Sequence, residues 1–194
     1  MTRSLDSFPL RPTRVHDASG PDATGFAVAA CAQAGGDVLW VHERWHASAI
    51  NPAGLSRFFD PANLLCAVAD DPADLLAVAE EALRDGAVSL VVIEISRPLD
   101  LRLGRRLQLA AKAGGSTGLC LTPEGGGSLA AETRWHVAPL HDAQSANSTL
   151  MRWTLIKNKS GTEGAWNVRW DHAARRLDVV SPVGERPGSA GVPG

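Results

Sequence analysis

The chain has 194 residues, a length that fits a single domain with a core large enough to need no disulfide or metal. Hydrophobic residues make up 44% of it and charged residues 21%, which is ordinary for a globular protein. The net charge of −2 excludes a global electrostatic attraction to nucleic acid or acidic lipid, although it leaves room for a local basic patch. No apolar run approaches the ~20 residues that span a bilayer, and the N-terminus lacks the apolar segment of a signal peptide, so we expect a cytoplasmic protein without membrane contact.

Three cysteines, Cys31, Cys66 and Cys120, lie far apart in apolar stretches. An odd number without a pairing pattern argues against a disulfide framework and for a reducing compartment. We expect all three to be buried as small hydrophobic residues rather than to act as ligands or nucleophiles.

Residues 1–12 carry two prolines and little periodicity, which predicts an N-terminal arm. From there to residue 122, short apolar runs of strand length alternate with segments of helical periodicity. The strands are predicted at 14–18, 37–41, 64–68, 88–95 and 118–122. The helices between them are predicted at 26–34, 51–59, 72–85 and 101–113. Strands that are apolar on both faces and alternate with helices indicate a parallel sheet covered on both sides.

A mobile loop is predicted at 123–132, and beyond it the period of the apolar residues changes to two. Strands are predicted at 133–140, 150–156, 165–170 and 177–181. Trp166 and Trp170 should face the core. The fold class is therefore α/β, with a mainly parallel central sheet flanked by helices and extended by C-terminal antiparallel strands. This core domain should span residues 13–181 and be followed by a disordered Pro/Gly-rich tail at 182–194.

The first loop has the glycine spacing of a phosphate-binding loop, whose form is G-x-x-x-x-G-K-[ST] between a strand and a helix. Gly20 and Gly25 stand five residues apart, with Pro21 after the first. Phe26 and Ala27 occupy the positions of the lysine, which neutralises the phosphates, and of the hydroxyl, which holds magnesium. A lysine about 4 Å from a phosphate charge contributes on the order of 4 kcal/mol at an effective dielectric near 20.

We therefore expect ATP binding to be lost or weak, with no cofactor and no hydrolysis of a triphosphate. The ring of Phe26 should pack in the contact between helix and sheet or close the mouth of the loop. On spacing alone, an ordinary strand-to-helix turn explains residues 20–25 equally well.

Several segments resemble the core of RecA-type recombinases in order and spacing. RVHDASGPDATGF matches the segment that carries the phosphate loop, and WTLIKNKSG a late strand with a Lys-Asn-Lys run. DVLWVHERW places Glu43 where those proteins have a catalytic glutamate, and SLVVIEIS places Glu94 where an acidic residue contacts magnesium-bound water. The resemblance implies a RecA-like fold in which the loop at 20–27 and the two glutamates are remnants of an ATPase site.

More closely, the sequence resembles the ImuA family, bacterial SOS-mutagenesis proteins that are shortened, degenerate recombinase homologues. The GP-x-x-x-GF loop, RRLQLAAKAGGSTGLCL, TRWHVAPL and a closing W-x-x-x-x-NK…G-x-W-x-V-x-W pattern carry this resemblance over residues 12–180. It implies a non-catalytic accessory role in the SOS response, DNA repair and error-prone translesion synthesis. The partners it implies are an ImuB-like polymerase homologue, a RecA-type recombinase or an error-prone polymerase, together with weak DNA contact.

A second degenerate recombinase relative, SulA, blocks cell division by binding FtsZ, and it is an alternative on the same fold. Beside a full recombinase the chain is short, without the N-terminal polymerisation helix or a C-terminal domain. We therefore do not expect it to form filaments by itself.

Two patterns raise an enzymatic alternative. The stretch 42–46, His-Glu-Arg-Trp-His, matches the H-E-x-x-H pattern of zinc hydrolases, which needs a helix so that both histidines face one metal. Here the stretch follows a buried strand directly and no third ligand stands at a suitable distance, so we predict no metal site. Ser19 and His16 are close in sequence, but nothing indicates an acid that would orient them, and we expect both on surface loops.

Basic side chains are frequent in the C-terminal strands, where tryptophans alternate with them. Basic and aromatic residues together can bind single-stranded nucleic acid by phosphate contact and stacking. The alternation favours core tryptophans instead, and Trp40, Trp45 and Trp135 are likewise assigned to packing. The candidate contacts for DNA or an acidic partner, foremost the two lysines, are Arg152, Lys157, Lys159, Arg175 and Arg176.

Overall fold

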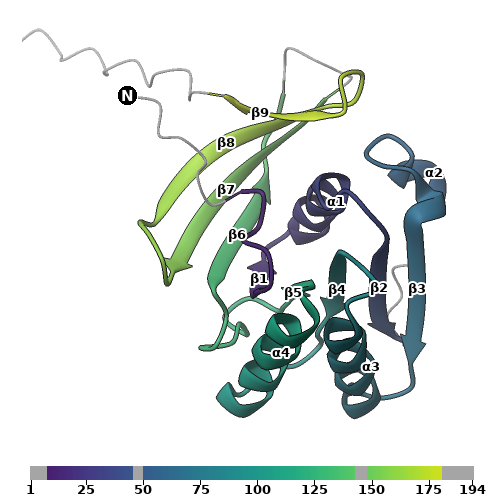
Figure 1. Cartoon of the computed structure of the whole chain (residues 1–194). Coiled ribbons are helices and arrows are strands. Elements are labelled where there is room, and N and C mark those ends of the chain that lie inside the picture. The colour runs from purple at the N-terminus through teal and green to yellow at the C-terminus, as the bar shows by residue number, and fades with distance from the viewer. Residues whose placement is uncertain (1–7, 46–49, 143–147, 181–194) are drawn as a thin grey trace, which may run out of the picture.

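The structure is a computed structural model of the chain, and it describes residues 8–45, 50–142 and 148–180. The predicted tail at 182–194 and most of the predicted arm lie outside these residues. The described strands form one continuous sheet (Figure 1). Its strands are β1 (Val15–Ser19), β2 (Val38–Glu43), β3 (Leu64–Ala69), β4 (Leu90–Glu94), β5 (Thr117–Leu121), β6 (Thr133–Pro139), β7 (Ser148–Asn158), β8 (Gly164–Asp171) and β9 (Arg176–Val180).

The order of the strands across the sheet is β3-β2-β4-β5-β1-β6-β7-β8-β9. The strands from β3 to β6 in this order run parallel to one another. The last three pair antiparallel as successive hairpins, beginning on β6. The predicted fold class, a mainly parallel core with an antiparallel C-terminal extension, is confirmed.

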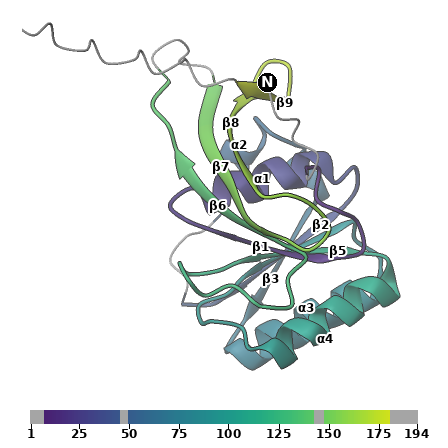
Figure 2. The ribbon, with the colours of Figure 1, turned by 90° about the vertical axis from the view of Figure 1, so that its left-hand side faces the viewer.

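Helices cover both faces of the sheet. The helix α1 (Ala23–Gln33) packs on one face, where the antiparallel strands curve round it, while α3 (Pro72–Asp85) and α4 (Leu101–Gly114) lie side by side on the other (Figures 1 and 2). A short helix, α2 (Pro52–Leu55), and a 3₁₀ turn, η1 (Pro61–Asn63), connect β2 to β3. No helix in the described part of the chain is long and apolar enough to cross a bilayer.

Local sequence signals set the ends of the two long helices. Asp71 accepts hydrogen bonds from the first two amides of α3, and Gly86 ends the helix with a φ of 77°. Asp100 caps α4 by accepting a hydrogen bond from the Leu103 amide, and Gly115 ends the helix with a φ of 76°. Because the signals at both ends are local, the predicted helix at 72–85 is confirmed and that at 101–113 is one residue too short.

The helix predicted at 51–59 is much shorter than expected. Asn51 caps it by accepting a hydrogen bond from the Ala53 amide, but α2 ends at Leu55. The chain then turns, with the amide of Phe58 bonded to the Leu55 carbonyl, and the ring of Phe58 stacks on Trp170 at 5.2 Å. Packing against a tryptophan from a distant strand therefore overrides the helical periodicity.

The core consists of two apolar layers, one on each face of the sheet. The layer around α1 contains the buried rings of Trp40, Trp135, Trp153 and Trp170, with the half-buried ring of Trp166 packed against it. The layer under α3 and α4 consists mainly of aliphatic side chains. The prediction that Trp166 and Trp170 face the core is therefore confirmed, as is packing of Trp40 and Trp135.

Two sequence predictions about burial are wrong, and one about a mobile loop needs correction. Cys66 is exposed because β3 is an edge strand, whereas Cys31 and Cys120 are buried as expected. Trp45 is 65% exposed, because it follows the end of β2 rather than lying within the sheet. The loop predicted to be mobile at 123–132 ends in a mostly buried stretch that is hydrogen-bonded to α4 and to β1.

Candidate functional site

The carboxyl ends of β1, β4 and β5 surround a cleft of about 380 Å³, in the position where open α/β sheets bind ligands. Gly20 and Thr24 line it from the loop after β1, and Glu94 and Trp45 from the ends of neighbouring strands. A second hollow, of about 360 Å³, lies beside it between α1 and α2, with Glu94 in its wall as well. This edge of the sheet is the candidate site.

The loop after β1 is shorter than its glycine spacing suggests. The helix α1 begins at Ala23, so Gly25 lies in the first helical turn and the loop consists of residues 20–22. Gly20 has a φ of 101°, and a Cβ at this position would lie 2.4 Å from the backbone oxygen of Val137 on β6. Only glycine therefore fits where the loop meets β6.

Three backbone amides of this loop and of the first turn of α1 are engaged within the protein. The amide of Asp22 donates to the Val137 carbonyl at 3.2 Å, and that of Ala23 to the Gly20 carbonyl at 3.2 Å. The amide of Phe26 donates to the Asp22 carbonyl. A working phosphate loop directs such amides at its ligand, so this loop has fewer donors to offer an anion.

A carboxylate lies over the N-terminal turn of α1. A Cβ on Gly25 would be 2.5 Å from Oδ1 of Asp22, which shows how closely that side chain covers the turn. Burial raises the pKa of the Asp22 carboxyl, and the Gly25 amide opposes this by favouring the charged form. A phosphate at the same place would meet a negative charge instead of an open helix terminus.

Phe26 points away from the cleft, into the apolar layer around α1. Its ring is fully buried. The centroid of the ring lies 4.6 Å from that of Trp153, 5.3 Å from that of Trp135 and 5.6 Å from that of Phe8. Ala27 is also fully buried. The prediction that Phe26 packs between helix and sheet is confirmed, and the position that carries a lysine in a working loop is part of the core here.

Glu94 lies in the walls of both hollows. It is 8% exposed, and its Oε1 accepts a hydrogen bond of 2.7 Å from Nε1 of Trp40 on the neighbouring strand β2. This contact holds the carboxylate in the wall between the two hollows. It also gives the buried indole of Trp40 a partner for its N–H group.

Glu43 does not join Glu94. Side chains alternate between the faces of a strand, so Glu43 shares the face of Val41, against α3 and α4, while Glu94 shares the face of Val92, against α1. Glu43 is 1% exposed, and no described residue donates a hydrogen bond to either of its carboxylate oxygens. The structure therefore separates the two glutamates that the resemblance placed in one site.

The stretch that matches the zinc pattern begins on a strand. His42 and Glu43 are the last two residues of β2, so their side chains lie on opposite faces, and His46 lies outside the described residues. Among the residues that the structure describes, no group of three or more His, Cys, Asp or Glu side chains could hold a metal ion.

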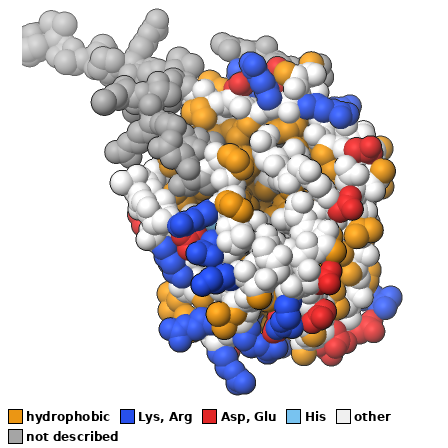
Figure 3. Space-filling model, in the orientation of Figure 1, with side chains coloured by type: hydrophobic (Ala, Val, Ile, Leu, Met, Phe, Trp, Pro, Cys, Tyr) orange, Lys and Arg blue, Asp and Glu red, His pale blue; other side chains and the backbone are white. Residues whose placement is uncertain are grey.

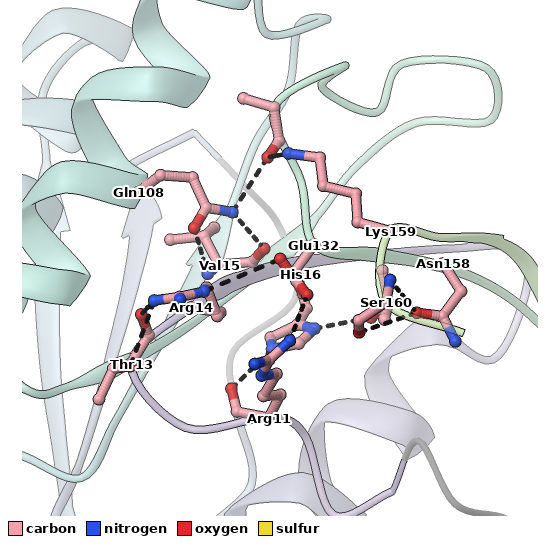
Figure 4. A network of polar contacts seen from close by, with 12 residues as sticks. Arg11, Thr13, Arg14, Val15, His16, Gln108, Glu132, Asn158, Lys159 and Ser160 are labelled. Atoms are coloured by element: carbon pink, nitrogen blue, oxygen red, sulfur yellow. Dashed lines mark hydrogen bonds and ion pairs between the residues drawn. The ribbon is translucent and has the colours of Figure 1, made fainter.

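The expectation that His16 and Ser19 lie on surface loops is wrong. Both are buried on β1, which is a central strand of the sheet. His16 Nδ1 lies 2.6 Å from Oγ1 of Thr133 and Nε2 lies 2.9 Å from the Arg11 carbonyl (Figure 4). Burial lowers the pKa of His16 from 6.5 to about 4, so the imidazole is neutral at pH 7 and has a structural role.

Its neighbour on β1, Asp17, is a buried carboxylate that sequence reasoning missed. Oδ2 of Asp17 accepts a hydrogen bond of 2.6 Å from the Ser128 amide and lies 3.7 Å from Nε of Arg134. Burial raises the pKa of Asp17 from 3.8 to about 6, against the lowering effect of these two partners. A strand with one buried face shows alternating apolar and polar residues, and a carboxylate on the apolar face then stands out. Both faces of β1 are buried, so its sequence carries no such signal for Asp17.

The predicted basic contacts lie in three separate places. Lys157 and Lys159, at the end of β7, donate to the carbonyls of Leu129 and Ala130 at 2.7 and 2.6 Å. Arg175, in the turn after β8, and Arg176, the first residue of β9, lie at the opposite end of the β7–β8 ladder, where they contact the Ser56 carbonyl and Asp178. Arg152 is exposed in the middle of β7.

Taken together, the strand order, the helices on both faces and the cleft at the carboxyl ends of β1 and β4 are consistent with a RecA-like core. The chain is similar to Protein ImuA from two strains of Caulobacter vibrioides, NA1000 / CB15N and ATCC 19089 / CIP 103742 / CB 15. Each is 33% identical to it over 148 residues, which cover 68% of this chain and 59% of the relative. The chain thus spans about three fifths of the length of these curated relatives. No model of a known protein family matches it.

Proposed function

We propose that the chain is a member of the ImuA family and acts as a non-catalytic accessory protein with a RecA-like fold. It works through contacts with other proteins, and secondarily with DNA, in SOS mutagenesis and error-prone translesion synthesis. The similarity to Protein ImuA supports the family. The observation that carries the non-catalytic part is the ring of Phe26, buried against Trp135 and Trp153 where a working loop has its lysine.

Two further observations support the loss of ATP binding. The Asp22 carboxylate covers the N-terminal turn of α1, and three amides of the loop and first turn already bond to backbone carbonyls. Glu43 and Glu94 lie on opposite faces of the sheet, so they do not form one acidic site for a magnesium ion. Each of these arrangements removes a different part of the phosphate-binding chemistry.

Calorimetric titration of the whole chain with ATP and magnesium tests the proposed lack of nucleotide chemistry. We expect no heat of binding at micromolar nucleotide, whereas an active RecA-type recombinase titrated in the same buffer should bind. Micromolar binding by this chain, or release of phosphate above the buffer rate, would contradict the proposal.

Co-purification tests the proposed partner. The tagged chain is co-expressed with the ImuB-like polymerase homologue of the same organism, and the two are expected to elute together from a sizing column. Reproducible separation of two folded proteins would count against an ImuA-type role. Filamentous cells on overexpression of the chain alone would instead favour a SulA-like division inhibitor.

A further inference from the structure

A groove of about 470 Å³ lies between α4 and the stretch 128–132, away from the cleft at the carboxyl ends of the strands. Three leucines line it and are exposed to water: Leu101 by 40%, Leu109 by 67% and Leu129 by 70%. The first two stand eight residues apart on one side of α4, and the third faces them from the other wall. Apolar side chains gathered in this way are typical of a surface that binds another molecule.

The wall that carries Leu129 is fixed in place. The Ser128 amide bonds to the buried Asp17 on β1, and the Ala130 carbonyl accepts from Gln108 of α4 at 3.1 Å. The ammonium groups of Lys157 and Lys159 hold the carbonyls of residues 129 and 130, so contacts from three other elements converge on this stretch (Figure 4 shows those of Gln108 and Lys159). These backbone contacts fix the Leu129 side chain in an exposed position, so the groove is preformed before a partner binds.

The rim of the groove is basic. Arg14, Arg105, Lys112 and Lys159 line it, and the one carboxylate among its lining residues, Glu132, is buried and paired with Arg11 and Arg14. Basic side chains are visible over α4 and the adjoining ends of the strands (Figure 3). Burial lowers the pKa of the neighbouring Lys157, and repulsion from Lys159 and Arg134 adds to this, while Asp17 and Glu132 oppose it.

We propose that this groove binds an acidic segment of a partner protein, which places apolar side chains on the three leucines and carboxylates against the rim cations. The inference rests on the proposed function, in that the chain acts by binding other proteins, and it adds the surface and the chemistry of the partner. Nucleic acid fits less well, because none of the described residues that line the groove is aromatic and able to stack on a base. A partner with apolar anchors uses both features of the groove.

Selection from random short peptides displayed on phage tests this chemistry without assuming a partner. The whole wild-type chain is the bait, and the double variant Leu109→Ser, Leu129→Ser is used to remove peptides that bind elsewhere. We expect the surviving peptides to share an excess of Asp and Glu and at least two large apolar residues. Their affinity is then measured by fluorescence anisotropy with synthetic, labelled copies.

The variants distinguish the groove from the rest of the surface. Each leucine-to-serine change should weaken peptide binding about tenfold, because a buried leucine contact is lost. Arg105→Glu and Lys112→Glu should weaken it by a similar factor, most strongly at low salt. The matched controls, Leu65→Ser on the exposed edge strand β3 and Arg57→Glu on the exposed segment after α2, should leave binding within twofold, and circular dichroism verifies that every variant is folded.

Four results would overturn the proposal. They are failure to enrich any peptide, enrichment of peptides without acidic residues, peptide binding that the groove variants leave intact, and tight binding of oligo-thymidine that the groove variants abolish. A dimer that dissociates on Leu109→Ser, seen by ultracentrifugation, would assign the groove to a second copy of the chain. Co-purification with the ImuB-like protein tests the proposed function separately, since it can succeed while all groove variants bind that protein normally.

Discussion

Replacement of Phe26 by alanine tests most directly whether the loop position has become part of the core. The side chain is fully buried and contacts three other aromatic rings. Truncation of a buried phenylalanine costs about 3–5 kcal/mol, and the aromatic contacts place this site toward the upper end. Because 1 kcal/mol shifts Tm by about 2–4 °C in a domain of this size, Tm should fall by about 10 °C or more.

Urea denaturation followed by tryptophan fluorescence measures this cost, and Trp135 and Trp153 report directly on the space that the ring leaves. Phe58→Ala is the matched control, since that ring is half-buried and should cost about 1–2 kcal/mol. A cost below about 1 kcal/mol for Phe26→Ala would refute the reasoning. So would a Phe26→Lys, Ala27→Thr double variant that keeps its stability and binds ATP, because the lysine would then have reached the cleft.

Three further predictions concern the same region. Gly20→Ala should destabilise the fold by about 2–3 kcal/mol in urea denaturation, against about 1 kcal/mol for Gly35→Ala, which also has a positive φ but open space around it; equal costs would remove the role of the contact with β6. Between pH 4 and 6.5 His16 binds a proton in the unfolded chain but not in the folded one, so it makes the free energy of unfolding rise with pH. Between pH 3.8 and 6 Asp17 binds a proton in the folded chain but not in the unfolded one, so it makes the free energy of unfolding fall with pH. In His16→Gln the free energy of unfolding should therefore fall with pH over this range, and in Asp17→Asn it should rise more steeply than in the wild type. Unchanged pH profiles would contradict both assignments. Trp40→Phe should cost about 1–3 kcal/mol in the same assay, because the hydrogen bond from the Trp40 indole to Glu94 is lost; a neutral effect would show that this hydrogen bond contributes nothing.

Features set by neighbours in sequence were predictable. The helix α3 has an aspartate cap, a proline in its first turn, an apolar face and a final glycine, all within sixteen residues from Asp71 to Gly86, and its bounds were predicted without error. The alternation in β8 likewise placed Trp166 and Trp170 correctly. In each case the information lies inside the element.

Features set by distant neighbours were not predictable. β2 and β4 are apolar on both faces, so nothing in either strand says which face Glu43 or Glu94 occupies, and their separation follows only from the register of the whole sheet. The glycines at 125–127 suggested mobility. The groups that fix the end of that loop are Lys157 and Lys159, about thirty positions further along the chain.

The position of β1 in the middle of the sheet delays the pairing of this strand while the chain is synthesised. β1 precedes the other described strands in the chain, yet it pairs with β5 around residue 118 and with β6 around residue 134. Until β6 has emerged, a strand with every side chain buried in the final fold has a partner on one side at most. Such long-range pairing slows folding and prolongs the exposure of apolar strands while the chain is being made.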